Sequence, residues 1–249
     1  MFSATDEAFM RRALDLAAMA MNHATPNPRV GCVLVRDRQV IAEGFTQRPG
    51  EPHAEAHAIR NARGKGQDLT GATAYVTLEP CNHFGKTPPC TEALIGAGVG
   101  RVVAAMEDPN PRVSGTGFER LREAGIDVRV GLLQQDATEL NIGFIKRMAT
   151  GLPWVRCKVA ASIDGRTGLA NGESKWITGD EARRDGHRWR ARACWSATTT
   201  STAPRGDGGT RWTWTRSGCA GTTTRRGSPP TTTCCCSTRA GPAHSLTTC

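Results

Sequence analysis

The 249-residue sequence lacks any apolar run of the ~18 to 20 residues that a helix needs to cross a bilayer. Its start, MFSATDEAFMRRALDLAAMAM, also lacks the basic lead and apolar centre of a secretory signal. These absences predict a cytoplasmic protein with no membrane partner. Thiols stay reduced in that compartment, so the ten cysteines are not expected to form a disulfide framework. Metal binding or catalysis is then the better interpretation of paired cysteines.

The end of the chain lacks valine, isoleucine, phenylalanine, lysine and glutamate from Trp195 onward. Almost every residue there has a codon with C or G at the middle position, as a one-base slip of the reading frame in a GC-rich gene would produce. We hypothesise a frameshift between roughly His187 and Trp195, which resequencing of the locus would test. A segment so poor in branched aliphatic residues cannot offset an ordering cost of ~1 to 2 kcal/mol per residue. Residues 194–249 are therefore expected to form a disordered tail.

The net charge of +9 carries little information about partners, because much of it lies in this tail. Six arginines and one aspartate in residues 194–249 contribute +5, which leaves +4 for residues 1–193. Such a modest excess does not require a nucleic-acid partner. We therefore expect no nucleic-acid partner. A homo-oligomer is compatible with the sequence.

Residues 1–146 have the pattern of one α/β domain. Ser3 and Asp6 form a plausible capping box before a helix with apolar residues at helical spacing. Strands are expected over 30–36, 40–46, 72–80, 101–106 and 127–133, and further helices over 53–64, 90–97 and 118–125. The first two strands are expected to form a hairpin. This alternation predicts an α/β sandwich with parallel pairing toward its end.

Residues 147–193 have the pattern of the start of a second, incomplete domain. Gly151 and Pro153 precede an expected strand over 154–162, followed by a turn and a helix over 179–193. No G-x-G-x-x-G sequence follows a strand here, so the residues alone predict no dinucleotide.

The stretch TLEPCNHFGKTPPC, residues 77–90, brings two thiols into one proline-rich loop. Cys81 and Cys90 bracket the loop, and His53 opens the helix that precedes it in the chain. Three such ligands are typical of a catalytic zinc site, in which the fourth position belongs to water. Glu55 stands two residues after His53, where it could transfer that water's proton to a leaving amine. We predict a Zn²⁺ site with Glu55 as its catalytic carboxylate.

The order H-A-E, then P-C, then a second cysteine resembles the signature of the zinc deaminases. Eight residues separate the two cysteines here, where the common form has two. With that spacing, TPNPRVGCV (25–33), HAEAHAIR (53–60), TLEPCNHFGKTPPC and EDPNPRVSGTG (107–117) closely resemble the bifunctional riboflavin-biosynthesis deaminase/reductase family, RibD. The resemblance continues through KVAASIDGRTGLANGESKWITG (158–179) and stops near Ala193.

This resemblance implies a fold and an activity for each half. The first domain would be a cytidine-deaminase-like three-layer sandwich with a mixed sheet. It would remove ammonia from a diaminopyrimidinone ribosylamine 5′-phosphate with zinc-activated water. Asn27 matches a position that helps to hold the substrate, although it could also be only a turn residue. Lys86 could meet the substrate phosphate, or it could be a solvated lysine.

The second half resembles the family's reductase, which uses NADPH to reduce the ribosyl chain on a dihydrofolate-reductase-like sheet. Matching positions place Ala160 and Trp176 near the nicotinamide nucleotide, and Ser174 and Arg190 near the substrate. Trp176 could instead be a core aromatic residue, and Arg190 could lie on a solvated helix face. Because most of this domain's pattern is missing from the reading frame, we expect the reductase activity to be impaired.

Two other functions remain open at this point. The domain could be a deaminase of another nucleoside or of an RNA base. It could also be a structural zinc-binding module without catalysis, in which His57 or His83 supplies a fourth ligand. Ammonia release from the competing substrates would separate these alternatives.

Overall fold

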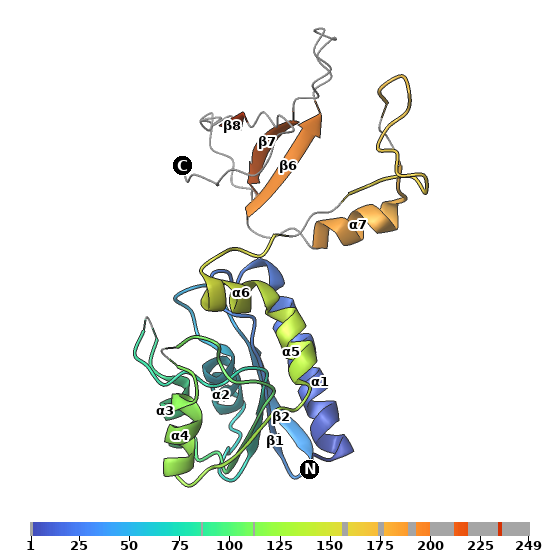
Figure 1. Cartoon of the computed structure of the whole chain (residues 1–249). Helices are drawn as coiled ribbons and strands as arrows, with labels where there is room; N and C mark the ends of the chain where they lie inside the picture. Colours follow the sequence, from blue (N-terminus) through green and yellow to red (C-terminus); the bar gives the residue numbers. More distant parts are fainter. Residues whose placement is uncertain are drawn as a thin grey trace. The chain divides into compact units, whose positions relative to one another are not determined.

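The computed structural model describes residues 2–85, 87–111, 113–155, 159–173 and 177–188, together with the backbone of three strands after them. The chain divides into two compact units, Met1–Cys157 and Lys158–Cys249 (Figure 1). Four residues given roles from the sequence lie outside the described residues: Lys86, Ser174, Trp176 and Arg190. The domain boundary after residue 146 stays a prediction.

The first unit is built on one mixed sheet of five strands in the order β2-β1-β3-β4-β5. The strands are β1 (Gly31–Arg36), β2 (Gln39–Phe45), β3 (Thr73–Val76), β4 (Arg101–Ala104) and β5 (Asp127–Val130). β1 pairs antiparallel with both β2 and β3, whereas β4 runs parallel to β3 and to β5. The expected hairpin and the parallel pairing toward the end of the domain are both confirmed.

Helices cover both faces of the sheet and complete the three-layer sandwich. They are α1 (Ala4–Met19), the short 3₁₀ helix η1 (Ala20–Asn22), α2 (Ala54–Gly64), α3 (Cys90–Gly96), α4 (Thr116–Glu123), α5 (Gln134–Leu140) and α6 (Ile142–Thr150). α1 packs on the strands of one face and also contacts α5, whereas α2 packs on β1 and β2 and contacts α3 (Figure 1). This is the expected cytidine-deaminase-like architecture.

Two glycines let the helices approach the sheet closely. A Cβ atom on Gly31 of β1 would lie 1.9 Å from the carbonyl oxygen of Ala13 in α1. A Cβ atom on Gly44 of β2 would lie 2.4 Å from the carbonyl oxygen of Ala54 in α2. Both distances are far below van der Waals contact, so only glycine allows these helix backbones to rest directly on the strands.

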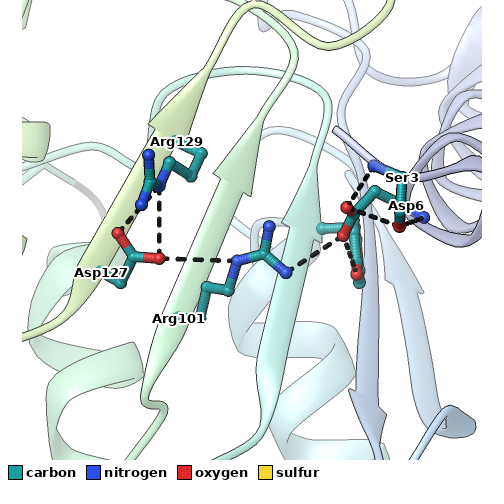
Figure 2. A network of polar contacts seen from close by, with 6 residues as sticks. Ser3, Asp6, Arg101, Asp127 and Arg129 are labelled. Carbon is teal, nitrogen blue, oxygen red and sulfur yellow. Dashed lines mark hydrogen bonds and ion pairs between the residues drawn. The ribbon is translucent and has the colours of Figure 1, made fainter. Parts of the chain in front are cut away.

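The expected capping box at the start of α1 is confirmed. Ser3 Oγ accepts a hydrogen bond from the Asp6 backbone N–H (3.1 Å), and Ser3 N–H donates to Asp6 Oδ2 (2.9 Å). The same buried carboxylate accepts from the Tyr75 hydroxyl of β3 (2.7 Å) and pairs with Arg101 of β4 (3.1 Å). Figure 2 shows the continuation of this network through Arg101 and Asp127 to Arg129 on β5. One carboxylate therefore joins the first helix to the middle of the sheet.

The region after β5 differs from the sequence expectation. A strand was expected over 127–133, but β5 ends at Val130, and Leu133, with a φ of 55°, precedes α5. Neither α5 nor α6 was predicted. Asn141 separates these two short helices and is almost fully buried, with a relative exposure of 3%.

The second unit is described only in part. α7 (Asp180–Arg188) agrees with the helix expected over 179–193. The strand expected over 154–162 is not found, since residues 154–155 and 159–162 are not in a strand. Among the described residues, no helix is both long and apolar enough to span a membrane.

A three-stranded sheet lies within the region expected to be disordered. Its strands are β6 (Ala193–Thr199), β7 (Trp212–Gly218) and β8 (Cys234–Cys235), in the order β6-β7-β8. For these residues the expectation of disorder does not match the structure. The expectation rested on missing valine and isoleucine, but β6 and β7 contain threonine and tryptophan, which also favour strands.

Candidate metal centre

The candidate site lies at one edge of the five-stranded sheet. Because β1 and β3 are antiparallel, the start of β1 lies beside the end of β3, and Gly31 N–H donates to Thr77 Oγ1 (3.1 Å). The end of β2 lies beside the start of β1, and the end of β4 lies beside the end of β3. The turn containing Asn27, the segment leading to His53 and the loop with both cysteines therefore leave the sheet at the same edge.

Helix starts position two of the three expected ligands. His53 follows Pro52 and is the N-cap residue of α2, with extended backbone angles. Cys90 is the first residue of α3 and follows Pro89, which is the N-cap residue there. Cys81 comes directly after Pro80, where the chain leaves the sheet, and its Sγ accepts from the Cys90 backbone N–H (3.4 Å). The prolines in both segments thus favour the helix starts at which the ligands stand.

The three ligand atoms face one another. His53 Nδ1 lies 3.6 Å from Cys81 Sγ and 3.4 Å from Cys90 Sγ, and all three atoms lie within 4.8 Å of one another. One imidazole nitrogen and two sulfurs at such separations suit tetrahedral zinc, which prefers these donor types. The residues present therefore fit the predicted Zn²⁺ ion.

The two alternative histidine ligands do not join this group. His57 Nδ1 lies next to the Phe45 backbone and 3.1 Å from Gln47 Nε2, so it supports the segment between β2 and α2. His83 is exposed. No fourth histidine, cysteine or acidic side chain completes the group among the described residues. This arrangement favours a catalytic site over a closed structural one.

The cysteine pair is set up to carry negative charge. The hydrogen bond from the Cys90 thiol, assisted by one from His53, lowers the pKa of Cys81 to about 4. The Cys81 thiolate and burial together raise the pKa of Cys90 well above its usual value. In the absence of metal the pair therefore holds one thiolate, and binding of a divalent cation would remove the second thiol proton.

Glu55 lies in the first turn of α2, two residues beyond His53, and its side chain is buried. Burial, together with the nearby Cys81 thiolate, raises the pKa of Glu55 to about 7. A carboxyl group with a pKa near neutrality can both accept and release a proton at physiological pH. The structure thus places a buried carboxyl group two residues from the first of the three ligands.

Glu79 is an additional site residue that was not predicted from the sequence. Its buried carboxylate accepts hydrogen bonds from the backbone N–H groups of Asp108 (3.1 Å), Gly115 (3.0 Å) and Gly117 (2.8 Å). These three residues belong to the segment 107–117, which precedes and begins α4. Glu79 therefore ties this segment to the strand end that leads to Cys81. The sequence signal was an acidic residue directly before the P-C pair.

Of the other residues predicted to contact substrate or nucleotide, the structure describes only Asn27 and Ala160. Asn27 is half-buried in the turn before β1, and its N–H donates to the Ala24 carbonyl (2.8 Å). Ala160 lies in a described part of the second unit that contains no strand. Ser174, Trp176 and Arg190 lie outside the described residues. The described residues of the second unit therefore do not assemble a nicotinamide site.

Two family models match the chain. That of the cytidine and deoxycytidylate deaminase zinc-binding region matches residues 3–106, and that of the RibD C-terminal domain matches residues 153–202. The riboflavin biosynthesis protein RibD of Escherichia coli K12 is 57% identical over 188 residues, which are 76% of this chain and 50% of that protein. The chloroplastic riboflavin biosynthesis protein PYRD of Zea mays is 51% identical over 160 residues, covering 64% of this chain and 40% of that protein.

Solved structures agree with these matches. A diaminohydroxyphosphoribosylaminopyrimidine deaminase/5-amino-6-(5-phosphoribosylamino)uracil reductase from Thermotoga maritima has a TM-score of 0.70 and 46% identity, covering 75% of this chain and 53% of that one. A RibD structure from Acinetobacter baumannii has a TM-score of 0.67 and 53% identity, covering 75% of this chain and 51% of that one.

The fold and the three-ligand centre define the class of the first unit, a zinc-binding deaminase domain of the cytidine deaminase type. Over the matched residues, the chain belongs to the RibD family of riboflavin biosynthesis proteins. It spans about half the length of the curated relatives it matches.

Proposed function

We propose that the first unit catalyses the deamination step of riboflavin biosynthesis. The substrate would be a diaminopyrimidinone ribosylamine 5′-phosphate, which loses one ring amino group as ammonia. The observation that carries the proposal is the open His53, Cys81 and Cys90 group with buried Glu55 beside it. The similarity to the diaminohydroxyphosphoribosylaminopyrimidine deaminase/reductase of Thermotoga maritima supports the choice of substrate.

In this proposal each residue has one task. His53, Cys81 and Cys90 hold a zinc ion, which when bound supplies Lewis-acid activation of the attacking water. Glu55 takes a proton from that water and returns it to the departing amino group. The hydrogen bonds of Glu79 keep the segment 107–117 against the cysteine loop. Asn27 holds the substrate from the turn before β1.

We propose that the family's second activity, the NADPH-dependent reduction of the ribosyl chain, belongs to the second unit and is impaired in this chain. The match to the RibD C-terminal domain supports this assignment. We propose that Ala160 and Trp176 would approach the nucleotide and that Ser174 and Arg190 would approach the substrate. Because residues 174, 176 and 190 lie outside the described part of the chain, their roles in the reduction stay predictions.

We also propose a cytoplasmic location and a small-molecule substrate. Cys32, Cys81 and Cys90 are free thiols, which suits a reducing compartment. The ligand role of the last two also requires that they remain reduced.

The proposed substrate is tested by ammonia release from the zinc-loaded full chain. Turnover of the diaminopyrimidine ribosyl phosphate should exceed turnover of cytidine and of an RNA oligonucleotide by at least about 100-fold, the discrimination expected of a site with matched polar contacts. Faster release from cytidine or RNA would support a deaminase of another base. No release from any of the three would support a structural zinc module.

Replacing Glu55 by Gln tests the catalytic role of the carboxylate within the same assay. The amide keeps the shape of the side chain but cannot carry the proton, so kcat should fall by roughly 10² to 10⁴-fold. Zinc content, measured by atomic absorption, should stay near one ion per chain. Glu51→Gln, on an exposed residue before α2, is the matched control and should keep its activity. Equal loss of zinc and activity in Glu55→Gln would contradict the catalytic role.

A further inference from the structure

The junction of α5 and α6 holds the turn that contains Asn27. Residues 140–147 lie more than 110 positions after this turn, yet four hydrogen bonds connect the two segments. The family model of the deaminase zinc-binding region ends at residue 106, so the helical junction lies outside the matched part. This connection therefore involves residues that the family model of the zinc-binding region does not cover.

Asn141 makes the central contact of this connection. Its Oδ1 accepts from the Arg29 backbone N–H and its Nδ2 donates to the Arg29 carbonyl, both at 2.8 Å. The side chain thus pairs with both backbone groups of one residue, as a neighbouring strand would. Asn141 is 3% exposed, so water cannot readily replace either bond.

Two arginines extend the connection to both sides of Asn27. Arg147 Nη2 donates to the Pro26 carbonyl, one residue before Asn27, at 2.8 Å. The guanidinium of Arg29, two residues after Asn27, donates to the Leu140 carbonyl at 3.2 Å. Arg147 also lies over the Phe144 ring, with its Cζ 5.8 Å from the ring centroid, which limits the positions its long side chain can take.

Other hydrogen bonds attach the two ends of the turn. At its start, Asn27 N–H donates to the Ala24 carbonyl (2.8 Å). After it, Val30 N–H donates to Thr46 Oγ1 (3.1 Å), and β1 begins at the next residue. The contacts from α5 and α6 therefore fix the backbone of the two residues that flank Asn27 and Pro28.

We propose that Asn141 and Arg147 are positioning residues for the deaminase site, which hold the Asn27 turn in the orientation that receives substrate. They do not touch the reacting atoms and act through the backbone of residues 26–29. The inference rests on the proposed function, because it takes Asn27 as a substrate contact. It adds that residues of the segment 107–152, which lies between the two family matches, help to position the substrate contact of the deaminase site.

A double-mutant cycle tests the proposal in the zinc-loaded full chain. Asn27→Ala and Asn141→Ala should each raise KM for the diaminopyrimidine ribosyl phosphate by about tenfold, the equivalent of about one hydrogen bond, with kcat changed less. The double variant should lose little more than either single variant, because Asn141 acts through Asn27. Additive losses would overturn the proposal.

The matched control is Asn61→Ala. Asn61 Nδ2 also donates to a backbone carbonyl, that of Glu43 (2.8 Å), but it lies in the last part of α2, away from the turn. Its removal should leave KM unchanged. If Asn141→Ala does not fold, Arg147→Gln serves as the second variant, since it removes the guanidinium that bonds to Pro26 and lies over Phe144 but leaves both Asn141 bonds in place.

Amide hydrogen exchange supplies a readout that does not depend on turnover. In Asn141→Ala the amides of Asn27 and Arg29 should exchange at least about tenfold faster, while zinc content and the exchange of β3 amides stay unchanged. Unchanged exchange at Asn27 would overturn the proposal even if activity fell. If the unaltered chain releases no ammonia from this substrate, the proposed function fails, and the exchange at Asn27 alone decides whether the junction holds the turn.

Discussion

Asp6 is the residue whose charge matters most for the first helix. Its carboxylate accepts from Ser3 and Tyr75 and pairs with Arg101, so α1 is attached to β3 and β4 through one side chain (Figure 2). Although burial opposes ionisation, the hydrogen bonds from Ser3 and Tyr75 and the charge of Arg101 together hold the pKa of Asp6 well below its ordinary value. The folded protein therefore prefers the ionised carboxylate.

Replacing Asp6 by Asn should lower the free energy of unfolding by about 1 to 3 kcal/mol at pH 7, the cost of a charged, partly buried hydrogen-bond acceptor. Because the pKa of Asp6 is lowered by folding, its contribution is fully present above the unfolded pKa of about 3.9 and is lost as the pH falls through the folded pKa. The difference in the free energy of unfolding between the unaltered protein and Asp6→Asn should therefore shrink below about pH 4. Urea unfolding of both proteins at pH 7 and at pH 3 measures this difference.

The control for this change is Asp37→Asn. The side chain of Asp37 is 93% exposed and lies 4.0 Å from Arg36, so its removal should cost less than about 0.5 kcal/mol at either pH. A loss for Asp6→Asn that is equal at pH 7 and pH 3 would contradict the role of its charge.

At the scale of elements, the position of α2 determines the position of the site. This helix carries His53 at its start and Glu55 in its first turn. It can rest on β2 because Gly44 has no side chain at the point of contact with Ala54 and Ala58. A change at Gly44 should therefore reach the metal ligands through the helix.

Gly44→Ala should lower the free energy of unfolding by about 1 to 3 kcal/mol and weaken zinc binding, since the new methyl group must push α2 away from the sheet. Urea unfolding and zinc competition with a chelator measure the two effects. Gly64→Ala, at the last residue of the same helix, meets no atom within 4 Å. It should be neutral or slightly stabilising, because alanine favours helix more than glycine does. Equal zinc affinity in both variants would contradict this coupling.

The sequence predicts the elements that have a regular pattern or a specific end. Ser3 with Asp6 predicted the start of α1, and the H-A-E and P-C motifs identified all three ligands that the structure brings together. It did not predict Glu79 or Asn141, because both act on backbone groups far away in the chain. A polar side chain that accepts or donates to distant backbone has no local spacing that would reveal it.

The helices after β5 show a second limit. DVRVGLL has the apolar pattern of a strand to its end, but Gly131 and Leu133 adopt positive φ angles and stop it. Each of α5 and α6 is too short for its periodicity to stand out, at seven and nine residues. The pairing of their junction with the Arg29 backbone, rather than helical propensity, defines where they lie.

At the scale of the whole molecule, the packing of the first unit differs from that of the described residues 159–173. The buried hydrophobic side chains of the described residues all lie between Met10 and Ala137. In the second unit, Val159 and Leu169 are each 64% exposed and Ile163 is fully exposed. The described residues 159–173 therefore gain little stability from burial. This exposure does not test the frameshift expected between roughly His187 and Trp195, which stays a prediction.

Limited trypsin digestion of the full chain should show this difference. Arg166, whose side chain is 75% exposed, should be cleaved early and leave a resistant fragment that contains residues 1–147 and its zinc. Arg63 is also exposed but lies in α2, so it should remain intact over the same period. Mass spectrometry of the digest measures both sites. Early cleavage after Arg63, with residues 159–173 protected, would contradict the assignment.

The convergence of strand ends at one edge also sets an order of events during synthesis. His53 and the two cysteines are 28 and 37 positions apart, and the antiparallel pairing of β1 with β3 is what brings their segments together. A nascent chain cannot enclose the ion until residue 90 has emerged from the ribosome and these distant strands have paired. Metal capture by all three ligands thus follows the pairing of β1 with β3, and a chain that holds its ion in this way has already assembled these two central strands.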